Sequence, residues 1–170
     1  IFSHIYKVYK VTPNAEITLE ANPDDLTSEY ISMLRTFPFN RISMGIQTFQ
    51  ETTLKQLQRR HTADQAIRAF QGCRTAGFQN ISIDLMYGLP GETLTSWKKD
   101  LKQALSLHPE HISAYHLIYE EGTPLWKLRE QHKVEEADED LSVSLFGTLI
   151  DELTTAGYEH YEISNFCLPG

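Results

Sequence analysis

Polar side chains that could bind a ligand recur where the predicted strands end. Glu20 and Asn22 follow a first apolar segment, Gln47 ends a second, and Asp84 interrupts the apolar run ISIDLM. The carboxyl ends of parallel strands meet at one rim of a sheet, where ligands bind, so these side chains should face a common site. A buried carboxylate is costly unless it is paired. Several polar groups on one rim therefore favour a ligand or a polar network.

Each of these residues also has a purely structural interpretation. Asn22 precedes a proline and is typical of a turn, and Gln47 could cap the helix that follows it. Asp84 could pair with Arg41 or Arg59. For any single residue the two interpretations remain open, and only their recurrence on successive strands favours a binding site.

A basic triplet and two further histidines are the other candidates for chemistry. Arg59, Arg60 and His61 follow the segment after the second strand. A guanidinium here could hold a ligand carboxylate through two parallel hydrogen bonds, and the alternative is a solvent-facing basic pair. His108 and His111 lack the helical spacing of metal ligands, which favours structural roles for both.

Cysteine chemistry is limited by number and spacing. The chain has only Cys73 and Cys167, without CxxC or CxxxCxxC spacing. The two residues cannot assemble a four-ligand metal site alone. Cys73 is expected to be a small apolar helix residue, and Cys167 an ordinary thiol.

A glycine-rich turn links the third predicted strand to a helix. The sequence GLPGET follows ISIDLMY, and Thr93 is placed to cap a helix whose apolar face contains Trp97 and Leu101. Such a strand, loop and helix junction lies at the ligand-binding edge of a parallel sheet.

Strands and helices are predicted to alternate along the chain. Strands are expected at 15–19, 40–47, 81–86, from 111 onward, and 158–166, and helices at 27–37, 51–60, 62–76, 94–105 and 141–155. This order predicts an α/β fold in which parallel strands form part of a (βα) TIM-like barrel, with residues 1–170 as a single domain. The chain lacks an initiating Met and begins with helical spacing at Ile1, Ile5 and Val8, so at least one upstream strand is expected outside it.

Composition narrows the classes of partner. The apolar fraction of 41% is ordinary for a globular protein, and the formal net charge of −8 argues against nucleic acid or an anionic membrane surface. No segment approaches the roughly 20 apolar residues needed to span a bilayer. A cytoplasmic location is expected.

Six segments together resemble the radical S-adenosylmethionine family. They are EANP (20–23), NRISMGIQ (40–47), LQRRH (57–61), AGFQNISIDLMYGLPGET (76–93), HISAYHLIYEEGTPL (111–125) and YEISNFCLPG (161–170). The match covers nearly the whole chain and is most similar to the oxygen-independent coproporphyrinogen III oxidases and their sister group of heme chaperones.

The resemblance implies a partial (βα) barrel with two cofactors. A 4Fe-4S cluster on three cysteines would bind adenosylmethionine, which is cleaved reductively to a radical. Glu20, Gln47, Arg59 and Asp84 fall where relatives contact adenosylmethionine, whose amine and hydroxyls suit acceptors and whose carboxylate suits a guanidinium. The CxxxCxxC motif is absent from this sequence. The chain alone is therefore expected not to bind the cluster, and the full protein is expected to carry it.

The end of the sequence favours one branch of the family. YEISNF followed by a Pro-Gly pair resembles the heme chaperones, which bind heme and deliver it to respiratory enzymes. The first alternative is a coproporphyrinogen III oxidase of porphyrin biosynthesis. An alternative from another class is a cofactor-free α/β module that binds a partner or a small metabolite.

Overall fold

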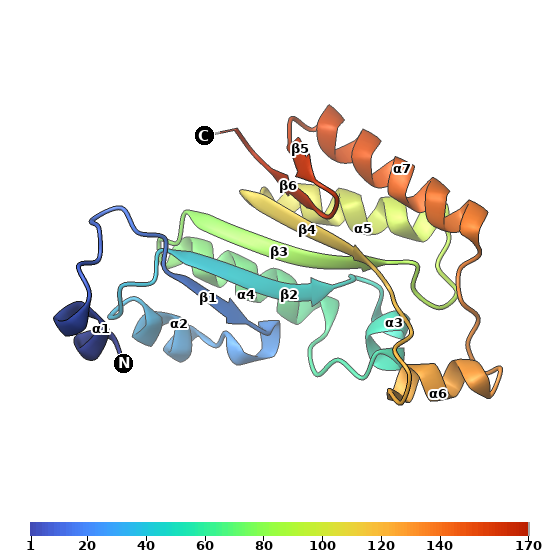
Figure 1. Ribbon diagram of the computed structural model, residues 1–170, viewed down its shortest axis with the longest axis horizontal. Coiled ribbons are helices and arrows are strands. Elements are labelled where there is room, and N and C mark those ends of the chain that lie inside the picture. Colours follow the sequence, from blue (N-terminus) through green and yellow to red (C-terminus); the bar gives the residue numbers. More distant parts are fainter. Residues whose placement is uncertain (170) are drawn as a thin grey trace.

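A computed structural model describes residues 1–169, in which strands and helices alternate (Figure 1). The strands are β1 (Thr18–Ala21), β2 (Arg41–Gln47), β3 (Asn80–Tyr87), β4 (His111–His116), β5 (Glu159–Glu162) and β6 (Asn165–Cys167). The helices are α1 (Phe2–Val8), the 3-10 turn η1 (Pro23–Asp25), α2 (Ser28–Leu34), α3 (Glu51–Gln56), α4 (Ala63–Thr75), α5 (Leu94–Leu107), α6 (Pro124–Glu130) and α7 (Glu139–Thr155).

All six strands form one sheet in the order β1-β2-β3-β4-β6-β5. The pairs β1/β2, β2/β3 and β3/β4 are parallel, and helices connect these strands. This arrangement confirms the α/β fold with parallel strands that the alternating sequence pattern predicts. The sheet is open, with β1 at one edge and β5 at the other.

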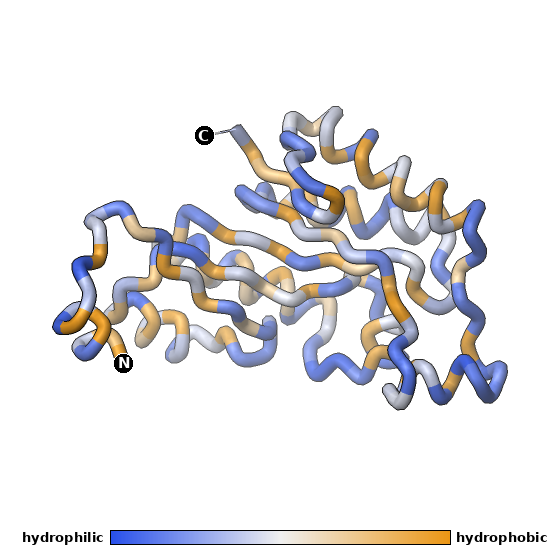
Figure 2. The backbone as a smooth tube through the Cα atoms, viewed as in Figure 1, coloured by the Kyte–Doolittle hydropathy of each residue, from blue (hydrophilic) through white to orange (hydrophobic). Residues whose placement is uncertain are grey.

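The two faces of the sheet have opposite character because side chains alternate along each strand. On β2, Ile42, Met44 and Ile46 are fully buried, whereas the residues between them are only partly buried. The buried side chains join one cluster with the apolar faces of α2, α4, α5 and α7, which cover one face of the sheet (Figure 1). Hydrophobic residues recur along α7 at helical spacing (Figure 2). Within residues 1–169, no layer of helices covers the other face, which carries polar side chains such as Ser43, Asp84 and Ser113.

Side-chain caps begin both α5 and α4, and the cap of α5 was predicted from the sequence. Thr93 accepts a hydrogen bond from the Ser96 N–H, and the Ser96 hydroxyl accepts one from the Thr93 N–H, so the predicted cap of α5 is confirmed. Thr62 and Gln65 form the same reciprocal pair at the start of α4. These caps satisfy N–H groups that have no partner inside the helix.

The carboxyl-terminal segment differs from the prediction. Residues 158–166 were expected to form one strand of a parallel sheet, but the segment is a hairpin, and β6 runs antiparallel to both β4 and β5. The Glu162 side chain accepts a hydrogen bond from the Ser164 N–H and another from the Asn165 side chain, which closes the turn. The prediction of a single strand is wrong because these polar residues stabilise a two-residue turn at 163 and 164. The alternation of apolar and polar residues continues through this turn and gives no sign of it.

Two boundaries also differ from the prediction. The first strand spans Thr18–Ala21 and not 15–19, and α3 ends at Gln56, so Arg59 lies in the loop between α3 and α4 rather than in a helix. Gln58 adopts a left-handed conformation with φ 54°. Its N–H bonds to Lys55 O, and the next N–H bonds to Leu54 O, which is the Schellman arrangement that ends a helix.

No helix among residues 1–169 has the length and hydropathy needed to cross a membrane.

Candidate functional site

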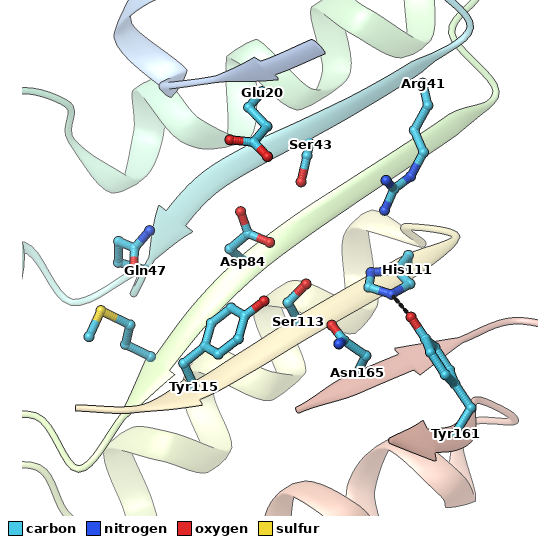
Figure 3. Close-up of a pocket in the computed structure, with 11 residues that line it drawn as sticks. Glu20, Arg41, Ser43, Gln47, Asp84, His111, Ser113, Tyr115, Tyr161 and Asn165 are labelled. Atoms are coloured by element: carbon cyan, nitrogen blue, oxygen red, sulfur yellow. Dashed lines mark hydrogen bonds between the residues drawn. The ribbon is translucent and has the colours of Figure 1, made fainter. Parts of the chain in front are cut away.

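The uncovered face of the sheet carries a polar cavity of about 620 Å³ (Figure 3). Its lining comes from all six strands of the described sheet: Glu20, Arg41, Ser43, Gln47, Asp84, Met86, His111, Ser113, Tyr115, Tyr161 and Asn165. A volume of this size falls within the roughly 300–1,000 Å³ that is typical of small-molecule sites.

Two carboxylates face each other across this cavity without a cationic partner. Strand pairing places Glu20 beside Ser43, and it places Asp84 between Gly45 and Ser113. Figure 3 shows the two carboxylates turned toward each other, with Ser43 beside the space between them. No ion pair in the described part of the chain includes either acid, so the pairing of Asp84 with Arg41 or Arg59, which the sequence left open, does not occur.

The surroundings of Asp84 disfavour its charged form. Burial raises the pKa of the Asp84 carboxyl, and the nearby Glu20 carboxylate adds to the rise, whereas hydrogen bonding with Ser113 and the charge of Arg41 oppose it. A positive ligand between the two acids would reverse this balance, because an opposite charge favours the ionised form.

Gln47 enters the cavity from an unusual backbone conformation. Its φ is 72°, and the Thr48 N–H bonds to Ile46 O at 3.0 Å, so Gln47 is the central residue of a γ-turn of the rare type. The ladder between β2 and β3 shifts register at this point. Such a conformation costs on the order of 1–3 kcal/mol and is found mainly where the surrounding structure enforces it.

Arg59 is held beside this group by the loop after α3. Its Nη2 donates to Asn22 Oδ1 at 2.8 Å and to Gly45 O at 2.9 Å. These two contacts use both Nη2 hydrogens and leave Nη1 and Nε for a ligand. Asn22 is therefore more than a turn residue, because it orients a guanidinium.

A smaller hollow continuous with the cavity brings together all of the predicted site residues. Its lining is Glu20, Ala21, Asn22, Ser43, Gly45, Gln47, Arg59 and Asp84. Gly45 keeps this space open, since a Cβ there would lie 3.2 Å from Gln47 Nε2 and 3.5 Å from the Arg59 guanidinium.

The cavity extends to residues that sequence reasoning treated as structural or did not consider. His111 Nδ1 is 2.8 Å from Ser82 Oγ, and its Nε2 is 2.7 Å from the Tyr161 hydroxyl (Figure 3). Ser113 and Tyr115 also line the cavity. Every second residue of a strand lies on the same face, so residues 111, 113 and 115 share one face of β4. Asp84 pairs with Ser113 and lies on that face too. The spacing of these residues in the sequence could therefore have identified them as part of the site.

The described residues do not fit an iron–sulfur cluster. Residues 1–169 contain no group of three or more His, Cys, Asp or Glu side chains arranged to hold a metal ion. Cys73 is fully buried in α4, and burial raises the pKa of its thiol to about 11, which disfavours the thiolate that metal binding needs.

Comparison with known proteins identifies the family. Residues 2–104 match the Radical SAM superfamily. The chain belongs to this superfamily. Its four parallel strands β1 to β4, with helices on one face, correspond to the partial TIM-like barrel of radical SAM proteins. The family implies adenosylmethionine and a 4Fe-4S cluster as cofactors.

Several curated relatives carry the same name. The heme chaperone HemW of Lactococcus lactis is 41% identical over 155 residues, which are 91% of this chain and 41% of that protein. The heme chaperone HemW of Haemophilus influenzae is 36% identical over 170 residues, covering 100% of this chain and 43% of that protein. The chain thus spans about two fifths of the length of these relatives.

Solved structures show the same fold. Coproporphyrinogen III oxidase (HemN) from Escherichia coli, described as a radical SAM enzyme, superposes with a TM-score of 0.83 at 25% identity, covering 98% of this chain and 38% of that one. Methylornithine synthase (PylB) matches with a TM-score of 0.65 at 13% identity, covering 83% of this chain and 39% of that one, which supports the fold alone.

Proposed function

We propose that this chain is the central and C-terminal part of the partial (βα) barrel of a radical SAM protein that acts as a heme chaperone. The observation that carries the proposal is the identity of 31% to 41% with relatives named heme chaperone HemW over more than nine tenths of the chain. The oxidase structure, by comparison, is 25% identical. Delivery of heme to respiratory enzymes, a cytoplasmic location, and folding of residues 1–170 as a single domain are parts of the same proposal.

The charges in the cavity fit adenosylmethionine. The cofactor carries an ammonium, a sulfonium and a carboxylate, and the site offers two unpaired carboxylates beside a guanidinium with free donors. Glu20 and Asp84 would accept from the amine and the ribose hydroxyls, and Arg59 would donate to the carboxylate. Gln47 would supply one more amide donor and acceptor at the end of β2.

The chain's own residues would bind and orient this cofactor. Cluster ligands are not among them, so the cluster would be held by another part of the full protein. When bound to the cluster, adenosylmethionine supplies one-electron chemistry. Arg59 is already fixed by Asn22 and Gly45, so little side-chain freedom would be lost on binding.

Heme binding tests the chaperone proposal directly. We expect the full-length protein, loaded with its cluster, to bind heme stoichiometrically and to transfer it to an apo heme protein, as followed by the Soret band. A cluster-loaded protein that does not bind heme would refute the proposal.

The runner-up function is that of an oxygen-independent coproporphyrinogen III oxidase. The superposition over 98% of the chain favours it. This alternative predicts oxidative decarboxylation of two propionates of coproporphyrinogen III to vinyl groups without oxygen, with an electron acceptor taking up two electrons for each propionate, and the products are detected by mass spectrometry. A cofactor-free binding module predicts instead that the full protein binds neither the cluster nor adenosylmethionine.

A further inference from the structure

A fully buried carboxylate on α5 binds the loop that follows Gln47. Asp100 is 0% exposed. It accepts hydrogen bonds from the Thr48 hydroxyl, from the Phe49 N–H at 3.2 Å, and from the Gln50 side chain at 2.8 Å. All three donors belong to the residues directly after Gln47, although Asp100 is about fifty positions further along the chain.

A second buried side chain holds the residue before Gln47. His61 is 3% exposed, and its Nε2 is 3.1 Å from Ile46 O. The same carbonyl receives the Thr48 N–H that closes the γ-turn. Gln47 is therefore fixed on both sides, by His61 through residue 46 and by Asp100 through residues 48 to 50.

A structural role alone does not explain an acid at position 100. The residue lies three positions after Trp97 and four before Ala104, on the apolar stripe of α5, where an apolar side chain would pack at no electrostatic cost. A buried carboxylate without a cation is costly, and its three donors only partly offset that cost. No ion pair in the described part of the chain includes Asp100. The buried carboxylate of Asp100 is explained if the protein requires this particular conformation of the 48–50 loop.

We propose that Asp100 is a positioning residue that holds the 48–50 loop, and with it the γ-turn, so that the Gln47 carboxamide stays in the cavity beside Gly45. His61 supports the same turn from the other side. This inference rests on the proposed role of Gln47 in binding adenosylmethionine. Asp100 itself does not line the cavity and would act only through the loop.

The test compares three variants of the full-length, cluster-loaded protein. Asp100→Asn keeps the size of the side chain but puts an amide against the donors, and Gln47→Ala removes the proposed ligand. Glu110→Gln is the control, because Glu110, like Asp100, accepts from a backbone N–H, that of Ile81 at 2.8 Å, and from a side chain, the Arg74 guanidinium at 2.6 and 2.8 Å, but it lies just before β4, at the amino ends of the parallel strands.

Two measurements are made on each variant: calorimetric titration with adenosylmethionine, and hydrogen exchange of the amides of residues 48 to 50 without ligand. We expect Asp100→Asn to weaken binding roughly tenfold or more, as substitutions of partners behind metal ligands do. We also expect it to speed exchange of the Phe49 amide. Glu110→Gln should lower the melting temperature while leaving both measurements unchanged.

The outcomes separate the inference from the proposed function. If Gln47→Ala weakens binding and Asp100→Asn does not, the positioning role is refuted and the site assignment stands. If Gln47→Ala binds as the wild type does, both are refuted. If Glu110→Gln weakened adenosylmethionine binding as much as Asp100→Asn does, the weakening would be explained by general destabilisation of the protein. That result would also refute the inference. Should Asp100→Asn fail to fold, Thr48→Val removes, at nearly constant shape, the hydroxyl that donates to Asp100 and accepts from the Gln50 N–H at 3.0 Å, and it is judged by the same measurements.

Discussion

Replacement of Gln47 by glycine should stabilise the protein relative to replacement by alanine. Both variants lose the carboxamide, so they differ only in the backbone freedom of residue 47, whose φ is 72°. The left-handed conformation costs a residue with a Cβ roughly 1–2 kcal/mol, and glycine escapes that cost. Glycine in turn loses about 0.5–1 kcal/mol of additional chain entropy on folding. The glycine variant should therefore be more stable by about 0.5–1 kcal/mol, the reverse of the order at an ordinary strand position.

Thermal unfolding of the two full-length variants checks this prediction. A difference of 1 kcal/mol shifts the melting temperature of a domain of 150–250 residues by roughly 2–4 °C. A matched Ala and Gly pair at Ser43, a β2 position without left-handed backbone, provides the control and should show the ordinary order. If the glycine variant at position 47 melted below the alanine variant, the γ-turn would not be strained. The argument that the buried side chains of Asp100 and His61 are needed to hold this turn would then fail.

Four further substitutions probe the neighbourhood of the site. Gly45→Ala should weaken adenosylmethionine binding in a titration with little loss of stability, because its Cβ would crowd the Gln47 carboxamide, at 3.2 Å from Nε2. Arg59→Ala should weaken the same binding by roughly 10- to 100-fold, as expected for loss of about 1.5–3 kcal/mol of hydrogen bonding to a charged group, and unchanged affinity with a lower melting temperature would favour a structural role instead. Gly88→Ala should lower stability by roughly 1–3 kcal/mol in thermal unfolding, because φ is 73° and the new Cβ would lie 2.7 Å from His116 Nε2. For Glu92, burial raises the pKa to about 7 in the folded protein, so the wild type should lose stability as pH rises from about 4.5 to 7, by at most roughly 3 kcal/mol, and Glu92→Gln should remove that slope in melting curves recorded between pH 5 and 8.

Much of the fold and the rim of the site could be predicted from the sequence because both depend on local patterns. Period-2 alternation located β2, and the GLPGET turn located the start of α5. Polar residues at successive strand ends then identified Glu20, Gln47 and Asp84, since parallel strands bring their carboxyl ends to one edge. The structure places these residues together around one hollow, and their role toward a cofactor remains a proposal.

The parts that could not be predicted depend on contacts distant in sequence. The left-handed backbone of Gln47 is enforced from α5 and from His61, and residue type gives no indication of it. The end of α3 is a Schellman arrangement with glutamine where glycine is usual, so no local signal placed Arg59 in a loop. Asp100 could have been recognised from the sequence, because an acidic residue on the apolar stripe of a helix is unusual. The sequence analysis did not consider it.

Among residues 1–169, the hairpin of β5 and β6 places β5 at one edge of the sheet. Strand β5 is exposed along its whole length and reads Glu-His-Tyr-Glu. An open strand edge is a template for pairing with another chain, and charged side chains are a common way of preventing it. Two copies that met along β5 would bring Glu159 and Glu162 of each into one small region, so the carboxylates discourage self-association through this edge. A strand that does add here would be favoured by basic side chains, which makes the β5 edge selective for charge.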